Sequence, residues 1–502
     1  ADNTGCLIEH FGNADAVPQP PERCLSRKAG IVRCCLKCIR KNQLCQLRPK
    51  KLRSDVVLYS TRFQILLFRR DSMPTLLALF SLALAAAVFA WEGLCCLRAG
   101  DFRAELSRRF SCEHALFGDF CWPQRQKLAG PLYFAALFVL LFGRIFLHAS
   151  KLYQIFPVWY DWPYCLYPLS YLLLTFKIFI CTRYNLRQML LSLAFFLLTV
   201  IGCLSFFDEN YFALMGFVLA FTDISWKRTL AWYAVLSALI VAILAALPFI
   251  TPVSMWYCNV PGYRLELGFE NPNHLSRVLF TIATACLLLL PLKKRRAAAL
   301  CIIFPIFLFV NRFPRTRSVC LALIVRSVLV VLYPLAVKLF EMRPIRALLT
   351  VCPVLLSAAG IFLAVGYDPS NPVWEKIAVF SNGRLQCWRM AAQAYDPRLL
   401  GQEIFYSAKM GELVAIDNSF LELLYAGGIL LFVVFLVALC FLLHRVLQQR
   451  RYWILCILLS WIAYSFFEAF FFRPFSNFML LLFAPLLFGQ PFPEDGTPSK
   501  IT

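Results

Sequence analysis

Long runs of apolar residues, separated by short polar segments, make up most of the chain after residue 73. The runs lie at 74–97, 131–149, 167–182, 188–207, 210–224, 229–250, 274–292, 297–311, 318–338, 345–366, 418–443, 452–470 and 475–489. Only helices and closed barrels satisfy all their backbone groups in lipid. The pattern therefore predicts an all-α, polytopic transmembrane bundle of roughly 11–13 spans. Most runs have about the length that crosses 30 Å of hydrocarbon, and some are shorter.

The composition excludes an ordinary soluble protein. Of the 502 residues, 60% are hydrophobic and 16% are charged, whereas a soluble domain has about 45–50% apolar and about 25% charged residues. A soluble core can hide one or two long apolar runs, but it cannot hide this many. We therefore expect a single membrane domain at 73–490.

The formal net charge of +22 lies mainly in short loops between the runs. Lys and Arg accumulate in cytoplasmic loops. This rule assigns four loops to the cytoplasm, at 225–228, 293–296, 341–346 and 444–451. The same assignment places the remaining loops outside, at 251–273, 312–317, 367–417 and 471–474. The positive charge therefore indicates orientation in a membrane, and no nucleic-acid partner is expected.

The N-terminal segment 1–72 departs from this pattern. It holds 14 Lys and Arg against 6 Asp and Glu. It should stay inside, as should the basic segment 98–130, yet a single apolar run separates the two. A re-entrant first segment, a missed span or an extension outside the mature fold would each resolve the conflict. The final residues, 491–502, are polar and rich in turn formers, which is typical of a disordered tail.

A zinc site is one alternative for the cysteines before residue 50. It would use Cys35 and Cys38 with Cys24 and Cys45, because tetrahedral Zn²⁺ accepts four thiolates. The spacing lacks a second C-x-x-C pair, so no metal is expected.

One outer loop, 367–417, is unusually long, and loops of this length are functional or disordered. Two Trp and several Leu favour an ordered loop along the membrane surface. Its middle, 384–395, predicts a helix, because Leu385, Trp388 and Ala392 recur at helical spacing.

The stretch "GFENPNHLSR" holds the first group of polar residues on the outer side. Its proline drives Asn271 out of helical geometry, and Asn273 then stands where an N-cap belongs. His274 and Arg277 follow on one face of the new helix. A helix start with these cations is an anion site; the alternative is a capped helix start with interfacial polar residues.

A second group is basic. "NRFPRTRSV" places Arg312, Arg315 and Arg317 on the side where positive charge is unusual. Arg is the favoured residue for bidentate contact with phosphate, and the alternative is snorkelling at the interface. Arg264, in the preceding outer loop, is either a further phosphate ligand or a solvated charge.

A third group opens the run at 418–443. Asn418, Glu422 and Tyr425 share one helical face, and Asp417 precedes them. An ionisable residue at a membrane boundary is a functional hypothesis by default, although Asp417 is also placed as an ordinary N-cap.

Glu468 lies inside a later apolar run, and Arg473 is its expected partner about one turn away. No Walker loop, Rossmann glycine pattern, H-E-x-x-H or G-x-S-x-G motif occurs. The absence of these motifs disfavours an energised pump or a metal hydrolase.

The order of four landmarks resembles the O-antigen polymerase and ligase superfamily. They are "GFENPNHLS", "RTRSVCLALIV", "GRLQCWRMAAQAYDPRLLGQEIF" and "DNSFLELLYAGGILLF", and the likeness covers 165–490. In the ligase branch a His precedes the Asn, Ser or Gln that lies ten positions before a Gly. Asn418 and Gly428 fit this frame, but Asp417 stands in place of the His. The chain is therefore more similar to capsule and exopolysaccharide polymerases.

The resemblance implies a glycosyltransferase C-like membrane enzyme of the bacterial cytoplasmic membrane. Its substrate would be an undecaprenyl-diphosphate-linked oligosaccharide, used on the outer side without metal, nucleotide or other cofactor. A flippase and a chain-length regulator would be protein partners. A ligase remains an alternative, as does a polysaccharide or solute transporter. A transporter often has repeated halves, and none is seen.

Glycosyl transfer from a lipid diphosphate needs positive charge at the leaving group and a base at the acceptor hydroxyl. We expect Asp417 to be the base and Arg384 to act in catalysis. The expected substrate-binding residues are Arg264, Asn271, Asn273, His274, Arg315, Arg317, Arg389, Asn418 and Glu422.

Overall fold

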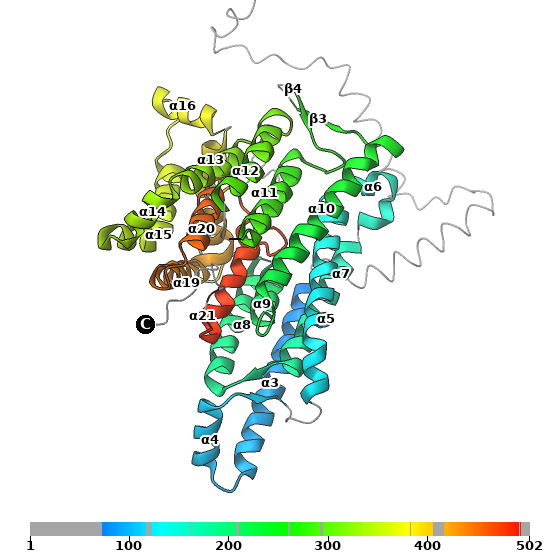
Figure 1. The fold of residues 1–502 in the computed structure, drawn as a ribbon, viewed down its shortest axis with the longest axis vertical. Coiled ribbons are helices and arrows are strands. Elements are labelled where there is room, and N and C mark those ends of the chain that lie inside the picture. Colours follow the sequence, from blue (N-terminus) through cyan, green and yellow to red (C-terminus); the bar gives the residue numbers. More distant parts are fainter. Residues whose placement is uncertain are drawn as a thin grey trace, which may run out of the picture. The chain divides into compact units, whose positions relative to one another are not determined.

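The computed structural model describes residues 73–116, 122–160, 162–206, 210–259, 262–291, 295–381, 383–404, 416–490 and 492. All of them belong to the compact unit Arg70–Thr502. The segment 1–72, with its zinc alternative, and the predicted tail apart from residue 492 lie outside the described residues. The described part is predominantly helical (Figure 1).

The first group of helices runs from α3 to α10. Its members are α3 (Met73–Arg98), α4 (Phe102–Ser111), α5 (Trp122–Leu141), the π-helix η1 (Phe142–His148), α6 (Leu152–Ile155), the 3-10 helix η2 (Pro157–Tyr160), α7 (Trp162–Cys181), α8 (Leu186–Phe206), α9 (Asn210–Leu219) and α10 (Trp226–Ile250). Helix α5 packs along α7, α7 packs on α9, and α8 contacts both α3 and α9.

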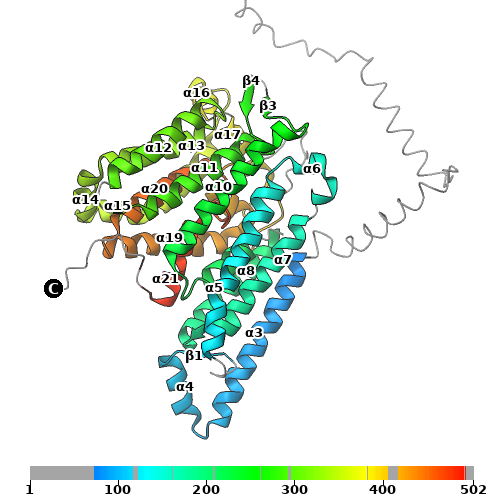
Figure 2. The ribbon, with the colours of Figure 1, turned by 45° about the vertical axis from the view of Figure 1, so that its right-hand side comes forward.

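The second group carries most of the predicted site residues. Its members are α11 (Pro272–Leu289), α12 (Arg295–Arg312), α13 (Arg317–Val331), α14 (Tyr333–Glu341), α15 (Arg343–Gly366), α16 (Pro372–Phe380), α17 (Arg384–Ala394), α18 (Ser419–Glu422), the π-helix η3 (Leu423–Gly427), α19 (Gly428–Gln448), α20 (Tyr452–Ser465), the 3-10 helix η4 (Phe478–Leu482) and α21 (Phe483–Phe488). The two groups meet where α10 packs along α11 (Figure 2).

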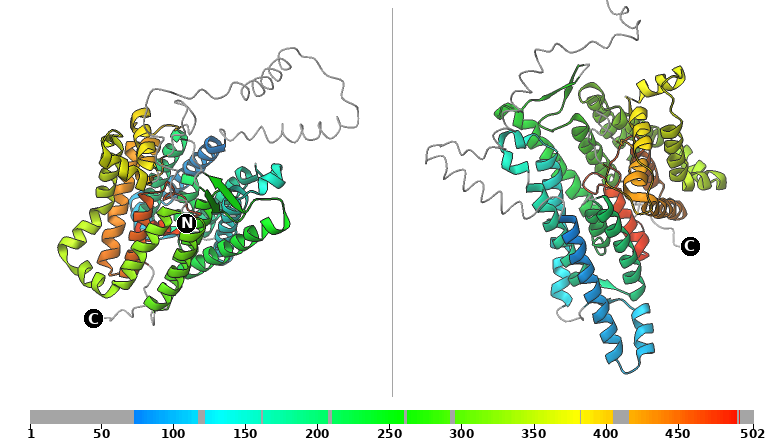
Figure 3. Two further views of the ribbon diagram at one scale, coloured as in Figure 1. Left: turned by 90° about the horizontal axis from the view of Figure 1, so that it is seen from above. Right: turned by 180° about the vertical axis from the view of Figure 1, so that it is seen from behind.

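The described part is mostly helical, in line with the predicted all-α bundle, and two short antiparallel strand pairs accompany the helices. Strands β1 (His114–Ala115) and β2 (Arg183–Tyr184) pair at one end of the first group. Strands β3 (Trp256–Asn259) and β4 (Gly262–Leu265) pair in the connection between α10 and α11, as Figure 3 shows.

Six of the described helices are long and apolar enough to cross a membrane. They are Leu79–Arg98, Trp122–His148, Trp226–Ile250, Pro272–Leu289, Arg343–Gly366 and Ser419–Gln448. Helices α13 and α14, bent by 81° where they join, count as a seventh if they form one broken span.

These are fewer helices than the 11–13 predicted spans. Two of the predicted runs form shorter apolar helices, at Tyr452–Ser465 and Phe478–Phe488. The apolar composition continues between them while the backbone turns, since the chain leaves helical geometry between Ser465 and Asn477. The apolar pattern alone did not predict this break.

Basic loops gather at one end of the bundle. The Arg450 Nη1 atom lies 3.9 Å from Glu341 Oε1, which joins the loops before α15 and after α19. The Arg295 guanidinium lies 4.6 Å from the Trp453 ring centroid, which adds the start of α12. The structure thus brings together three of the loops that the charge pattern assigned to one side of the membrane.

The helix that begins at Ser419 is broken inside the bundle. It passes from α18 through the π-helix η3 to Gly428, whose φ is +88°. The segment 398–402 lies against the break, where Ile429 N donates to Arg398 O at 2.9 Å and Gln402 N donates to Ala426 O at 2.9 Å. Backbone groups in a membrane must find partners, and this segment supplies them.

Candidate functional site

A cluster of charged residues forms where helices α13, α17 and α18 begin. Arg384, the first residue of α17, donates from Nη2 to Glu468 Oε1 at 2.6 Å. Its Nε lies 3.4 Å from Asp417 Oδ2. Ser318, near the start of α13, donates to the same Glu468 oxygen at 2.6 Å. We call Arg384, Asp417, Glu468 and Ser318 the Arg384 cluster.

Local backbone geometry determines where the side chains of the Arg384 cluster lie. Gly383, with φ of +78°, turns the chain so that α17 starts at Arg384. Ser419 donates from Oγ to Glu468 O at 2.6 Å and accepts from Phe470 N at 3.2 Å. This hydroxyl pins the non-helical segment that follows α20 to the start of α18. The carboxylates of Asp417 and Glu468 are consequently held on the same guanidinium.

The three charges of the cluster influence one another. Limited hydration and the nearby charge of Glu468 raise the pKa of Asp417 above its ordinary value, against the opposing effect of Arg384. Burial by itself would lower the pKa of Arg384, but the carboxylates of Glu468 and Asp417 raise it. Of the three side chains Asp417 is the most accessible, at 43% exposed against 15% for Arg384. It is therefore the carboxylate of this cluster that can meet a substrate.

A second, cationic cluster lies beside the first. Arg277 on α11 is only 9% exposed, and its guanidinium faces the rings of Phe470 and Phe475 at 5.5 and 6.0 Å. Within the described part of the chain it forms neither an ion pair nor a side-chain hydrogen bond. Arg473 lies near enough to repel it, and Glu468 near enough to attract it.

His274 and Arg144 extend this cationic cluster. His274 Nδ1 is buried and has no hydrogen-bond partner among the described residues, while Arg277 and Arg473 lie within electrostatic reach of its ring. The Arg144 guanidinium lies 3.7 Å from the Tyr167 ring and 5.7 Å from the Phe475 ring that Arg277 also faces. We call Arg144, His274, Arg277 and Arg473 the cationic cluster.

Sequence reasoning missed Arg144 as a site residue. It lies in the predicted run at 131–149 and is 7% exposed in the π-helix η1. An ionisable residue inside a membrane helix is itself a functional signal, and that signal was available at this position. The partner expected for Glu468 was also wrong. Arg473 lies 3.5 Å from Glu422 instead, because residues 466–477 are not helical and one-turn spacing does not apply.

Arg264 has a different environment from the one expected of a phosphate ligand. Its Nε donates to Pro314 O at 2.7 Å, and its Nη2 donates to Asn273 Oδ1 at 2.8 Å and to Thr316 Oγ1 at 3.3 Å. These bonds tie the start of α11 to the turn before α13. The guanidinium therefore holds two helix starts together.

The N-cap predictions also need correction. Asn271, and not Asn273, caps α11, and its Oδ1 accepts from Asn273 N at 2.8 Å. Pro272 takes the first helical position, where its missing N–H is no loss. Asn418, and not Asp417, caps α18 by accepting from Phe420 N and Leu421 N. Asn418 is fully buried and its oxygen is used for capping, while its Nδ2 has no hydrogen-bond partner among the described residues.

The remaining predicted residues lie around the two clusters without joining them. Arg317 donates to Val379 O of α16 at 3.2 Å, and Arg315 is exposed with φ of +53°. The Arg389 guanidinium lies 5.9 Å from the Tyr367 ring. The predicted helix in the long loop is confirmed as α17, which buries Leu385 and Trp388.

Comparisons of this chain with models of protein families, with curated proteins and with solved structures each find no match. Its function must therefore be argued from the site. The geometry supplies a partly exposed carboxylate on an arginine, next to a buried arginine that forms no ion pair with any residue the structure describes. Buried charge is costly unless it is paired, so the cationic cluster is suited to hold an anion beside Asp417.

Proposed function

We propose that this protein is a membrane glycosyltransferase that polymerises lipid-linked oligosaccharides. In this proposal it joins undecaprenyl-diphosphate-linked repeat units on the outer side of a bacterial cytoplasmic membrane. The observation that carries the proposal is Arg277, a buried guanidinium that lacks an ion-pair partner among the described residues. It lies beside Arg473 and near Glu468 of the Arg384 cluster, so an anion held there would have a carboxylate next to it.

The proposed mechanism uses each cluster for one task. The diphosphate of the donor binds at the cationic cluster, and the acceptor hydroxyl faces Asp417. The acceptor oxygen forms a bond to the anomeric carbon while the bond from that carbon to the diphosphate oxygen breaks. The proton of the hydroxyl passes to Asp417, and the electron pair of the broken bond leaves with the lipid diphosphate. The arginines stabilise the charge that develops on the leaving group.

Arg384 positions Asp417, the base in this mechanism. It holds Asp417 and Glu468 together, and its charge favours the ionised form of Asp417 against the limited hydration. The helices α16 and α17 in the segment 367–417 would cover the outer surface of a glycosyltransferase C-like bundle. Asn271, Asn273 and Arg264 position the start of α11, which carries His274 and Arg277.

One incubation distinguishes a polymerase from a ligase and from a transporter. Purified protein is mixed with lipid-diphosphate-linked repeat units, and the products are resolved by gel electrophoresis. A polymerase gives a ladder of products. A ligase transfers a glycan once to a different acceptor, and a transporter gives no new product. A reaction without a ladder, with protein that is shown to be folded, would overturn the proposal.

The side of the membrane is tested separately. Single cysteines at positions 384 and 417, in a background without other cysteines, are treated with a membrane-impermeant thiol reagent in intact cells. The proposal expects labelling from outside. Labelling only after the inner face is opened would place the Arg384 cluster on the wrong side for this substrate.

A further inference from the structure

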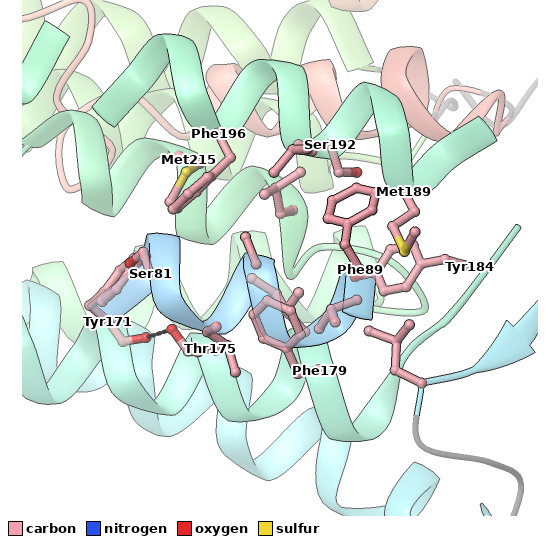
Figure 4. A pocket seen from close by; sticks show the side chains of 17 residues that line it. Ser81, Phe89, Tyr171, Thr175, Phe179, Tyr184, Met189, Ser192, Phe196 and Met215 are labelled. Carbon is pink, nitrogen blue, oxygen red and sulfur yellow. Dashed lines mark hydrogen bonds between the residues drawn. The ribbon is translucent and has the colours of Figure 1, made fainter. Parts of the chain in front are cut away.

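A hollow of about 80 Å³ lies between α3, α7, α8 and α9, within the first group of helices. Figure 4 shows Ser81, Tyr171 and Thr175 at one end, and Tyr184, Met189 and Ser192 toward the other. None of these residues takes part in the proposed glycosyl transfer.

The walls of the hollow are hydrocarbon, aromatic rings and thioethers. Phe89, Phe179 and Phe196 line it, together with Met189 and Met215. Methionine adapts its shape to an irregular apolar partner. A lining of this kind favours a flexible hydrocarbon chain over a polar ligand.

The hydroxyl groups at the Ser81 end are satisfied by the protein itself. Ser81 Oγ pairs with the Tyr171 hydroxyl, and Thr175 donates to Tyr171 O at 2.8 Å. These groups do not require water inside the hollow. On α8, Ser192 Oγ is buried and has no hydrogen-bond partner within the described residues, so a ligand with one polar group would find a partner on this wall.

The far end of the hollow, at Tyr184, adjoins a basic region. The β1–β2 pairing brings the segment around His114 to Arg183, and the Arg183 guanidinium lies 4.4 Å from the Trp122 ring. Segments 98–116, 122–127 and 183–188 meet there and hold 8 Arg and Lys against 3 Asp and Glu. Arg187 and Lys127 are exposed.

We propose that the hollow takes up part of one acyl chain of an anionic phospholipid, with the phosphate at the basic end. The chain would lie along α3 and α8, and the charge of the headgroup complements Arg187 and Lys127. Basic surfaces at the ends of membrane helices are suited to anionic lipids. The inference is independent of the proposed glycosyl transfer, because it uses neither the Arg384 cluster nor the cationic cluster.

Native mass spectrometry of the full chain tests the proposal. Protein in mixed micelles is offered palmitoyl-oleoyl phosphatidylglycerol or phosphatidylcholine with the same chains. We expect one retained phosphatidylglycerol per protein, and about tenfold less phosphatidylcholine, a ratio that corresponds to about 1.4 kcal/mol. Ala85→Phe, which fills the hollow, should reduce retention about tenfold or more. Ala86→Phe is the matched control, since Ala86 is the next residue of α3 and is exposed.

Two further variants keep the test decisive. Ser192→Leu fills the hollow from α8 with a smaller change, and should lower retention if Ala85→Phe does not fold. Arg187→Gln combined with Lys127→Gln should remove the preference for phosphatidylglycerol without emptying the hollow. Equal retention of both lipids by the wild type would overturn the proposal, as would equal retention by Ala85→Phe and Ala86→Phe, or binding of detergent only.

Discussion

Arg384 Nη2 and Glu468 Oε1 form a hydrogen bond of 2.6 Å, although 84 residues separate them in the chain. This bond joins the helix of the long loop to the segment after α20. Asp417 Oδ2 lies 3.4 Å from Nε of the same guanidinium. The pairing is the basis of the proposed catalytic arrangement, and it can be tested residue by residue.

Removing either partner of the Arg384–Asp417 pair should stop chain elongation. We expect Asp417→Asn to lower the polymerisation rate about 10²- to 10⁴-fold, since it removes the proposed base. Arg384→Ala should lower it about 10²- to 10³-fold, which is typical of a lost electrostatic contact. Rates are measured on lipid-linked repeat units, with membrane insertion followed in parallel. Gln386→Ala, at an exposed position of α17, is the control. Polymers of normal length in both variants would remove these residues from the mechanism.

The activity should depend on pH through Asp417. A base must be ionised to accept a proton, so the rate falls as pH drops through the pKa of Asp417. Because burial and Glu468 raise that pKa above the ordinary 3.8, the fall should begin at a higher pH than for a solvated aspartate. Glu468→Gln removes one cause of the increase, and the acidic limb should move to lower pH. An acidic limb that is the same in wild type and Glu468→Gln would show that another group controls it.

Arg277 and Arg264 should give opposite results when they are substituted. Arg277→Met removes a buried charge that lacks an ion-pair partner among the described residues, so the thermal stability should be unchanged or higher by about 1–4 kcal/mol. Binding of undecaprenyl diphosphate should weaken roughly 10- to 100-fold. Arg264→Gln should lower stability, because it breaks the bonds to Asn273, Thr316 and Pro314.

Thermal melting with and without the lipid diphosphate separates the two effects. Lys376→Gln removes an exposed charge on α16 and controls for net charge. A loss of stability in Arg277→Met, with unchanged lipid binding, would assign Arg277 a structural role.

Lys151 and Glu266 form a buried ion pair. Replacing Lys151 alone should destabilise the folded protein, and replacing Glu266 as well should restore its stability. Glu266 is fully buried and accepts a hydrogen bond from Lys151 Nζ. Burial raises the pKa of Glu266 against the opposing effect of Lys151, so its ionisation costs stability as pH rises above the ordinary 4.5. Lys151→Met should therefore lose about 3–5 kcal/mol at neutral pH and lose less at pH 4. Adding Glu266→Gln should restore most of the stability; no rescue would contradict the assignment.

Gly428 should not tolerate a side chain. Its φ is +88°, and a Cβ there would lie 2.2 Å from Gly401 N. Gly428→Ala should therefore cost about 2–4 kcal/mol from the unfavourable backbone conformation and the overlap together, seen as a lower melting temperature. Gly93→Ala is the matched control, because nothing lies within 4 Å of its added Cβ. An equal response of both variants would show that the contact with Gly401 is not restrictive.

Much of the helical framework could be predicted from the apolar runs, and α17 from the spacing of Leu385 and Trp388. The partners of the charged residues could not. Local periodicity carries no information about a bond such as Arg384 to Glu468, which spans several helices. The same limit applies to Arg144, which meets Phe475 through tertiary packing. The break at Gly428 could not be predicted from the sequence either, because a π-helix has the same apolar composition as the α-helix around it.

The backbone bonds between the segment 398–402 and the broken helix have a consequence for how this sequence can change. The backbone N–H of Ile429 donates to the carbonyl of Arg398, and the backbone N–H of Leu430 donates to the carbonyl of Leu399. An insertion or deletion between Ala394 and Gln402 would shift that register by a residue and leave amides at the break unsatisfied. Homologous chains should therefore keep this stretch at constant length even where its side chains differ.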